Sequence, residues 1–133
     1  MTGKLERANE LTRIIINCGL SLHLQIGPGL IESVYEQVLA DRLNGLGLKV
    51  DRQKPVDIMI DGKTYTGAFR YDLLIENVLL IELKSIEKLG PIHLKQTLTY
   101  IRLMNLPIGL LLNFGGETFK QGIRRITNNH WKE

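Results

Sequence analysis

The sequence has few of the features that mark secreted, disulfide-bonded or membrane proteins. Its 133 residues include one cysteine, Cys18, which excludes a disulfide framework and a zinc site built from several cysteines. The longest apolar runs, such as residues 78–81 and 108–112, are far shorter than the roughly 20 residues that a membrane-spanning helix requires. Residues 1–10 are charged and contain no apolar signal core. We therefore expect a cytoplasmic protein with no membrane segment.

The composition and charge are those of an ordinary folded domain. Hydrophobic residues make up 44% of the chain and charged residues 23%, and a length of 133 residues predicts a single domain over residues 1–133. The net charge is +3, and the surplus lies in residues 67–133, which carry nine basic and six acidic side chains. This surplus permits contact with a phosphate backbone, but it is equally typical of a slightly basic soluble domain.

The spacing of apolar residues predicts three helices. Apolar positions at intervals of three and four residues indicate a first helix over residues 5–26, which Gly27-Pro28-Gly29 ends, and a second helix over residues 30–46. Gly90-Pro91 is expected to open a third helix over residues 92–104, because proline suits the first helical position.

Between and after these helices the pattern is that of strands. The dipeptides Asp61-Gly62 and Glu76-Asn77 predict tight turns, so residues 56–84 are expected to form a β-meander of three or four strands. Residues 107–113 predict a buried strand, and residues 119–126 form either a last strand or a short helix. The order of elements predicts an α/β fold with a mixed sheet flanked by helices.

Three charged side chains are expected to meet on the hairpin that turns at residues 76 and 77. Asp72 lies on the predicted strand 70–75, and Glu82 and Lys84 lie on the next strand, two residues apart and therefore on one face. Counted outward from the turn, Asp72 and Glu82 are equally distant from Asn77, so the two carboxylates are predicted to share a site.

A pair of carboxylates at one site points to a divalent cation. The two charges repel each other, and Mg²⁺, which binds one or two carboxylates together with water and phosphate oxygens, relieves that repulsion. A neighbouring lysine can hold an attacking water or neutralise charge in the transition state. Metal and lysine together are suited to phosphodiester hydrolysis. The alternative hypothesis is a structural ion pair at the end of a strand.

Two helix faces add polar side chains that could belong to the same site. Glu32, Tyr35 and Glu36 share a face of the second helix, where Glu32 could equally be a stabiliser of the helix N-terminus. His93, Gln96 and Tyr100 share a face of the third helix, opposite the residues expected to pack on the sheet, and this face could equally be a solvated one.

The ordered set of these residues resembles a known family. Gly29-Leu30-Ile31-Glu32-Ser33-Val34-Tyr35 has the form G-x-x-E-x-x-Y, and Asp72, Glu82-Leu83-Lys84 and the helix with His93, Gln96 and Tyr100 follow in order. With these motifs the chain resembles the GxxExxY family, a group of small prokaryotic proteins of the PD-(D/E)XK nuclease superfamily, over about residues 10–126. One departure is that Tyr71, and not proline, precedes Asp72.

The resemblance implies a fold, a cofactor and roles for the site residues. The fold would be a restriction-endonuclease-like core, with a mixed four-stranded sheet flanked by helices in the order αβββαβ and one extra N-terminal helix. Asp72 and Glu82 would bind Mg²⁺ or Mn²⁺, with Glu32 completing the acidic shell, and Lys84 would assist the water. Gln96 would support the site, with Tyr35, His93 and Tyr100 as further supporting residues.

The function expected from these features is metal-dependent hydrolysis of nucleic acid, with DNA expected ahead of RNA. The alternative is a catalytically silent module on the same fold that binds nucleic acid or another protein. Arg124 and Arg125 form a candidate phosphate-contacting patch, although such a pair is often only a solvated surface. A homodimer is a further expectation, because two small subunits can flank a duplex.

Overall fold

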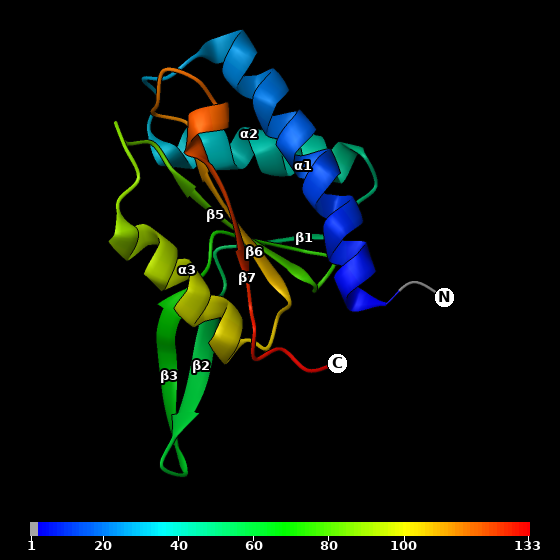
Figure 1. Cartoon of the computed structure of the whole chain (residues 1–133), viewed down its shortest axis with the longest axis vertical. Helices are drawn as coiled ribbons and strands as arrows, with labels where there is room; N and C mark the ends of the chain where they lie inside the picture. The colour runs from blue at the N-terminus through cyan, green and yellow to red at the C-terminus, as the bar shows by residue number, and fades with distance from the viewer. Residues whose placement is uncertain (1–2) are drawn as a thin grey trace.

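The computed structural model describes residues 3–133, which form three helices, a short 3₁₀ helix and seven strands (Figure 1). The helices are α1 (Lys4–Ile26), α2 (Glu32–Gly45), α3 (Pro91–Leu103) and the 3₁₀ helix η1 (Lys120–Gly122). The strands are β1 (Val50–Arg52), β2 (Pro55–Ile60), β3 (Lys63–Arg70), β4 (Leu73–Ile75), β5 (Leu79–Lys84), β6 (Ile108–Asn113) and β7 (Ile123–Thr127). The predicted α/β class, with a mixed sheet flanked by helices, is confirmed.

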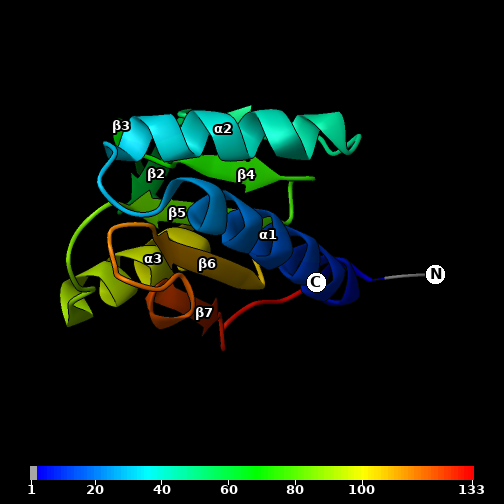
Figure 2. The same ribbon diagram turned by 90° about the horizontal axis from the view of Figure 1, so that it is seen from above.

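The central sheet has five strands in the order β1-β4-β5-β6-β7, in which β5 and β6 are parallel and all other neighbours are antiparallel. Along β5, Leu79, Ile81 and Leu83 point into the larger core, which α1 and α2 cover. Leu80 points to the opposite face and packs with Ile101 of α3. Figure 2 shows α1 and α3 on opposite sides of β6. The period-two alternation therefore directs Glu82 and Lys84 to the α3 face.

The middle of the chain differs from the predicted meander. Strands β2 and β3 leave the sheet and form a two-stranded ribbon of their own, although their turn at Asp61-Gly62 is as predicted. The chain departs after β1 at Gln53, whose φ is 51°, and returns at Asp72. The backbone bond from Gln53 N to Asp72 O (3.0 Å) closes the base of the ribbon. Alternation of apolar residues indicates strands but not the sheet they join.

Other element boundaries also differ from the prediction. The sheet has five strands and not four, because β1, which is only three residues long, adds an edge next to β4. Asp72 lies in a bend just before β4 and not within a strand. The undecided segment 119–126 contains both alternatives, since η1 is followed directly by β7. None of the helices within residues 3–133 has both the length and the apolar character needed to cross a membrane.

The connection between α1 and α2 is held by a tyrosine from the G-x-x-E-x-x-Y motif. Gly29 has a φ of 118°, a conformation that favours glycine. The Tyr35 side chain is 1% exposed and stacks on Phe114, with ring centroids 4.6 Å apart. Its hydroxyl donates to Gly27 O (2.5 Å) and accepts from Leu30 N (3.3 Å), so Tyr35 fixes the loop that leads into the first turn of α2.

Removal of the Tyr35 hydroxyl should destabilise the fold. We expect Tyr35→Phe to lower the free energy of unfolding by about 1–2 kcal/mol, because Gly27 O and Leu30 N lose their partner while the aromatic stacking remains. Urea unfolding followed by circular dichroism measures the change. Tyr65→Phe is the matched control, since Tyr65 lies on the exposed ribbon and is 50% exposed. Equal losses in the two variants would contradict the role given to Tyr35.

Candidate active site

Asp72 and Glu82 are joined by a reciprocal pair of hydrogen bonds. The β4–β5 register pairs Leu73 with Ile81, which places Asp72 opposite Glu82. Asp72 N donates to Glu82 Oε2 (2.7 Å), and Leu83 N donates to Asp72 Oδ2 (2.8 Å). Each carboxylate therefore accepts a hydrogen bond from the backbone at or next to the other acid. The two acids are brought together as the hairpin count predicted.

Burial and mutual repulsion make both acids difficult to ionise. Glu82 is 5% exposed, and burial, followed by the charge of Asp72, raises the pKa of Glu82 to about 8. Burial also raises the pKa of Asp72, against the lowering effect of the hydrogen bond from Leu83 N, and the charge of Glu36 raises it further. Ionisation of both adjacent carboxyl groups is unfavourable unless a positive charge lies close to them.

Lys84 is the nearest source of that charge on the same strand. It is the last residue of β5 and lies on the same face as Glu82, and its ammonium group lowers the pKa of both Asp72 and Glu82. None of the ion pairs found among residues 3–133 includes Lys84. The structural ion pair considered as an alternative is thus absent from the described chain, and the ammonium group is available to a ligand.

Two further residues, Gln53 and Glu36, extend the cluster. Gln53 Nε2 donates to Glu36 Oε1 and to Asp72 Oδ1, the latter at 3.3 Å. Glu36 is 3% exposed and also accepts two bonds from Arg52, at 2.8 and 3.2 Å. Helix spacing had placed Glu36 on one face with Glu32 and Tyr35, among the side chains that could belong to the site. Gln53 has no such signal, because only the departure of the ribbon from the sheet brings it next to Asp72.

Glu32 lies at the edge of the cluster, in the first turn of α2. Burial raises the pKa of Glu32, and the charge of Asp72 raises it further, so the two groups are electrostatic neighbours. Within the described residues, however, no group of three or more His, Cys, Asp or Glu side chains is arranged to hold a metal ion. The structure therefore brings together the pair Asp72 and Glu82, and a third ligand from Glu32 stays a prediction.

The three polar residues of α3 have different surroundings. His93 acts locally, since Gly90 N donates to its Nδ1 (2.8 Å) at the start of the helix. Gln96 is exposed and makes no hydrogen bond to the cluster within residues 3–133. Tyr100 packs with the apolar cluster on the α3 face and stacks on Phe69, with centroids 4.0 Å apart. Burial raises its pKa, and the charges of Glu82 and Asp72 contribute, so only Tyr100 of the three is shown to face the acids. The predicted separation of this polar face from the packed face is therefore wrong for Tyr100.

Arg124 and Arg125 do not form one patch. They are consecutive residues of β7, so their side chains leave opposite faces of the sheet. Arg125 Nη2 donates to Asn9 Oδ1 of α1 at 2.7 Å. Arg124 is paired with Leu111 in the β6–β7 register, on the α3 face. Only Arg124 therefore shares a face with Glu82 and Lys84.

Comparison with known proteins identifies the family to which this arrangement belongs. A family model described as the PD-(D/E)XK nuclease superfamily matches residues 9–126. The chain belongs to this superfamily. Its fold is similar to that in the crystal structure of SSO0001, with a TM-score of 0.53 and 18% identity over 89% of this chain and 78% of that chain. No curated relative matches the chain.

Nucleases of the PD-(D/E)XK superfamily generally use divalent metal ions, and the acids of this chain suit such an ion. The donors are two carboxylates of like charge, that of Glu82 buried and that of Asp72 half-buried. Hard cations such as Mg²⁺ prefer oxygen ligands and often take only one or two carboxylates. Burial raises the pKa of both acids, so a cation bound between them would stabilise their ionised forms. The chemistry of the donor set therefore fits a divalent cation.

The raised pKa of Glu82 has a measurable consequence in the metal-free protein. A carboxyl group whose pKa is about 8 in the folded chain and near 4.5 when unfolded contributes stability at low pH that is lost as the pH rises through 8. We expect Glu82→Gln to gain stability relative to the wild type between about pH 5 and pH 9, by on the order of 2–4 kcal/mol, since one pKa unit corresponds to roughly 1.4 kcal/mol.

Chemical denaturation at a series of pH values, with a chelator present, measures this difference. Glu76→Gln is the control, because hydrogen bonds from Lys49 N and Arg7 lower the pKa of Glu76, so its contribution should stay constant above about pH 5. A pH-independent difference between Glu82→Gln and the wild type would show that Glu82 ionises normally.

Proposed function

We propose that this protein is a divalent-metal-dependent nuclease that hydrolyses phosphodiester bonds of nucleic acid, with DNA as the preferred substrate. The observation that carries the proposal is the pair of Asp72, half-buried, and Glu82, buried, which reciprocal hydrogen bonds hold together. Lys84 lies on the same face and is free of any ion pair within the described residues. Membership of the PD-(D/E)XK nuclease superfamily supports the same conclusion.

In this proposal each residue has a distinct task. Asp72 and Glu82 would hold Mg²⁺ or Mn²⁺, with Glu32 at the rim of the site. When bound, the ion would polarise the scissile phosphate and lower the pKa of a water. The ammonium group of Lys84 would orient that water and neutralise charge developing on the phosphate. Tyr100 and Gln96 would support the site from α3.

We further propose that the chain belongs to the GxxExxY group of the superfamily. The structure gives a physical reason for each residue type in that motif. Gly29 has a positive φ, Tyr35 binds the loop backbone, and Glu32 is an electrostatic neighbour of Asp72. We also propose a single domain over residues 1–133 that acts as a homodimer, so that two sites can flank a duplex.

Loss of the proposed catalytic groups should abolish cleavage without unfolding the protein. We expect Asp72→Ala, Asp72→Asn and Lys84→Met to lower the rate of cleavage of labelled DNA with Mn²⁺ or Mg²⁺ by at least about 100-fold. Lys95→Met, at an exposed position of α3, is the matched control for the loss of a lysine. The absence of cleavage of any DNA or RNA form by the wild type with either metal would refute the nuclease activity.

Calorimetric titration with Mn²⁺ separates the nuclease from the catalytically silent module. A nuclease should bind Mn²⁺ with a heat that is lost in Asp72→Asn, because the carboxylate is the ligand. A silent interaction module should show no heat that depends on Asp72.

The bridge made by Gln53 generates a separate prediction. We expect Gln53→Met to weaken Mn²⁺ binding by about tenfold, because outer-shell partners of metal ligands typically contribute 10- to 100-fold in affinity. Methionine has a similar volume but cannot donate to Glu36 and Asp72. Calorimetry measures the affinity, and Gln37→Met, at an exposed position of α2, is the control. An unchanged affinity would mean that Gln53 does not position Asp72 for the metal.

A further inference from the structure

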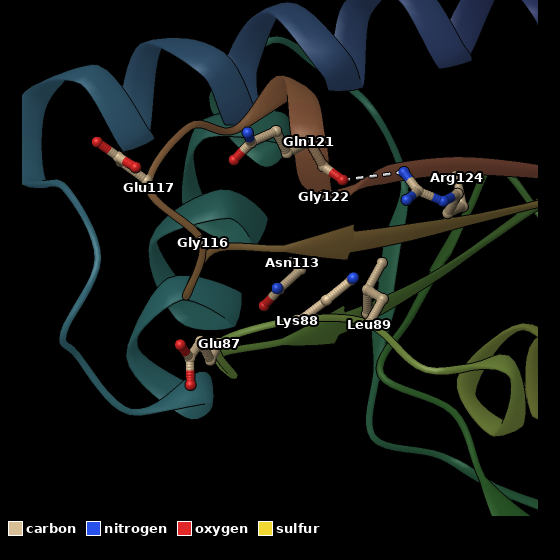
Figure 3. Close-up of a pocket in the computed structure, with 9 residues that line it drawn as sticks. All are labelled: Glu87, Lys88, Leu89, Asn113, Gly116, Glu117, Gln121, Gly122 and Arg124. Atoms are coloured by element: carbon tan, nitrogen blue, oxygen red, sulfur yellow. Dashed lines mark hydrogen bonds between the residues drawn. The ribbon is translucent and has the colours of Figure 1, made fainter.

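A cavity of about 780 Å³ lies at the end of β6, the strand next to the one that carries Glu82 and Lys84, and neither Asp72 nor Glu82 lines it. It opens between the β5–α3 connection and the segment that contains η1 and the start of β7 (Figure 3). The side chains that matter for its chemistry are those of Glu87, Lys88, Leu89, Glu117, Gln121 and Arg124. Cavities of roughly 300–1,000 Å³ accommodate small organic ligands, including a nucleotide.

The register of the sheet places two residues that line this cavity, Asn113 and Arg124, on the same face as the acids. Lys84 is paired with Asn113, and Leu111 with Arg124, so Lys84, Asn113 and Arg124 all lie on the α3 face at the edge where β5 and β6 end. β7 is two strands away from β5, which corresponds to roughly 10 Å. Since one strand of B-DNA advances roughly 3.4 Å per nucleotide, a strand cleaved at Asp72 and Glu82 can reach the cavity within a few nucleotides.

The cavity carries separate positive and negative ends. Figure 3 shows Arg124 at one side of the cavity and Glu87 and Glu117 at two separate places on the other side, with Lys88 between Glu87 and Arg124. Arg124 Nη1 donates to the carbonyls of Gln121 (2.9 Å) and Ile123 (2.8 Å), and within residues 3–133 no acceptor binds its Nε or Nη2. Neither Arg124 nor Lys88 is part of an ion pair in the described chain. The guanidinium therefore keeps donors for an anion.

Hydrogen bonds and close backbone packing fix the walls of the cavity. Asn113, which is 2% exposed, accepts from Ile86 N (3.0 Å) and donates to Ile86 O (2.9 Å), so it ties the β5–α3 connection to the end of β6. On the opposite wall, a Cβ atom on Gly122 would lie 2.5 Å from Asn113 O, so only glycine permits this close approach. The cavity is thus held in shape before any ligand binds, which lowers the cost of ordering on binding.

We propose that this cavity binds one nucleotide of the substrate strand, close to the scissile phosphate. The assignment rests on the proposed nuclease function and deepens it. The phosphate of that nucleotide lies at Arg124 and Lys88, because guanidinium and ammonium groups bind phosphate oxygens. The base lies toward Glu87 and Glu117, whose carboxylates accept hydrogen bonds from the amino groups of cytosine and adenine. Thymine has no amino group and is disfavoured.

Equilibrium binding of a fluorescein-labelled ten-nucleotide single-stranded DNA, with chelator present to prevent cleavage, tests the phosphate end. We expect Arg124→Gln and Lys88→Gln each to weaken binding about tenfold, as for loss of one charged hydrogen bond. Arg102→Gln, at an exposed position of α3, removes one positive charge elsewhere and should change the affinity less than twofold. Thermal melts confirm that the variants are folded.

The outcomes of this experiment are distinct. Equal losses of DNA affinity in Arg124→Gln, Lys88→Gln and Arg102→Gln would mean that DNA is held by general charge attraction. An equal loss of affinity in a further variant, Arg125→Gln, would mean that DNA binds to a basic surface and not in the cavity. Either result overturns the cavity assignment. No change at Arg124 and Lys88 overturns it as well.

The base end is tested with two labelled decamers, oligo-dC and oligo-dT. We expect the wild type to bind oligo-dC about fivefold more tightly than oligo-dT. Glu117→Gln should reduce this preference, whereas adding Arg124→Gln to it should still weaken the binding of both decamers. Equal affinity for the two decamers in the wild type would overturn the orientation of the base.

Cleavage measured separately with Mn²⁺ distinguishes this assignment from the nuclease proposal. A protein that cleaves DNA but shows no effect of Arg124 and Lys88 on binding would be a nuclease without this subsite. A protein that binds DNA through Arg124 and Lys88 but never cleaves it would refute the nuclease function alone.

Discussion

The repulsion between two carboxylates, one buried and one half-buried, is the constraint around which this structure is organised. Asp72 and Glu82 lie opposite each other where the chain enters β4 and β5 nears its end. Glu82 accepts a hydrogen bond from the backbone of Asp72, and Asp72 accepts one from the backbone next to Glu82. The bonds align the two strands, yet they do not remove the electrostatic cost, which remains visible in the raised pKa values. Such a site is suited to bind a cation, because a bound cation offsets the unfavourable electrostatic energy of two ionised carboxylates.

A hydrogen-bond network connects Asp72 to residues of several neighbouring elements. Gln53 links Asp72 to Glu36, and Arg52 binds Glu36 in turn, so α2, β1 and the bend before β4 are joined by one polar network. No buried side-chain polar atom within residues 3–133 is left without a partner. A network that is fully satisfied can hold several charged groups in one arrangement, whereas a partly satisfied one would favour collapse or rearrangement. The acids are consequently presented to the α3 face in a fixed geometry.

The candidate site was predictable where it depends on local periodicity. Period-two alternation places Glu82 and Lys84 on one face, and the turn at Glu76-Asn77 places Asp72 opposite Glu82, so three residues follow from counting along a hairpin. Helix spacing placed Glu32 on one face with Tyr35 and Glu36, and its role as a ligand stays a prediction. Gln53 could not be found by such reasoning, since its contact with Asp72 depends on a ribbon that leaves the sheet and returns between these two positions.

Alone, the sequence determined the order of helices and strands, the buried character of β5 and β6, and the pairing of the two acids, because these depend on interactions between residues near in the chain. Tertiary structure decided the fifth strand, the separate β2–β3 ribbon and the cavity beside β7. It also separated Arg124 from Arg125, which adjacency in the sequence had suggested were partners. The physical reason is that strand order and the direction of a side chain at an edge depend on which distant segments bury each face, and no local pattern records that choice.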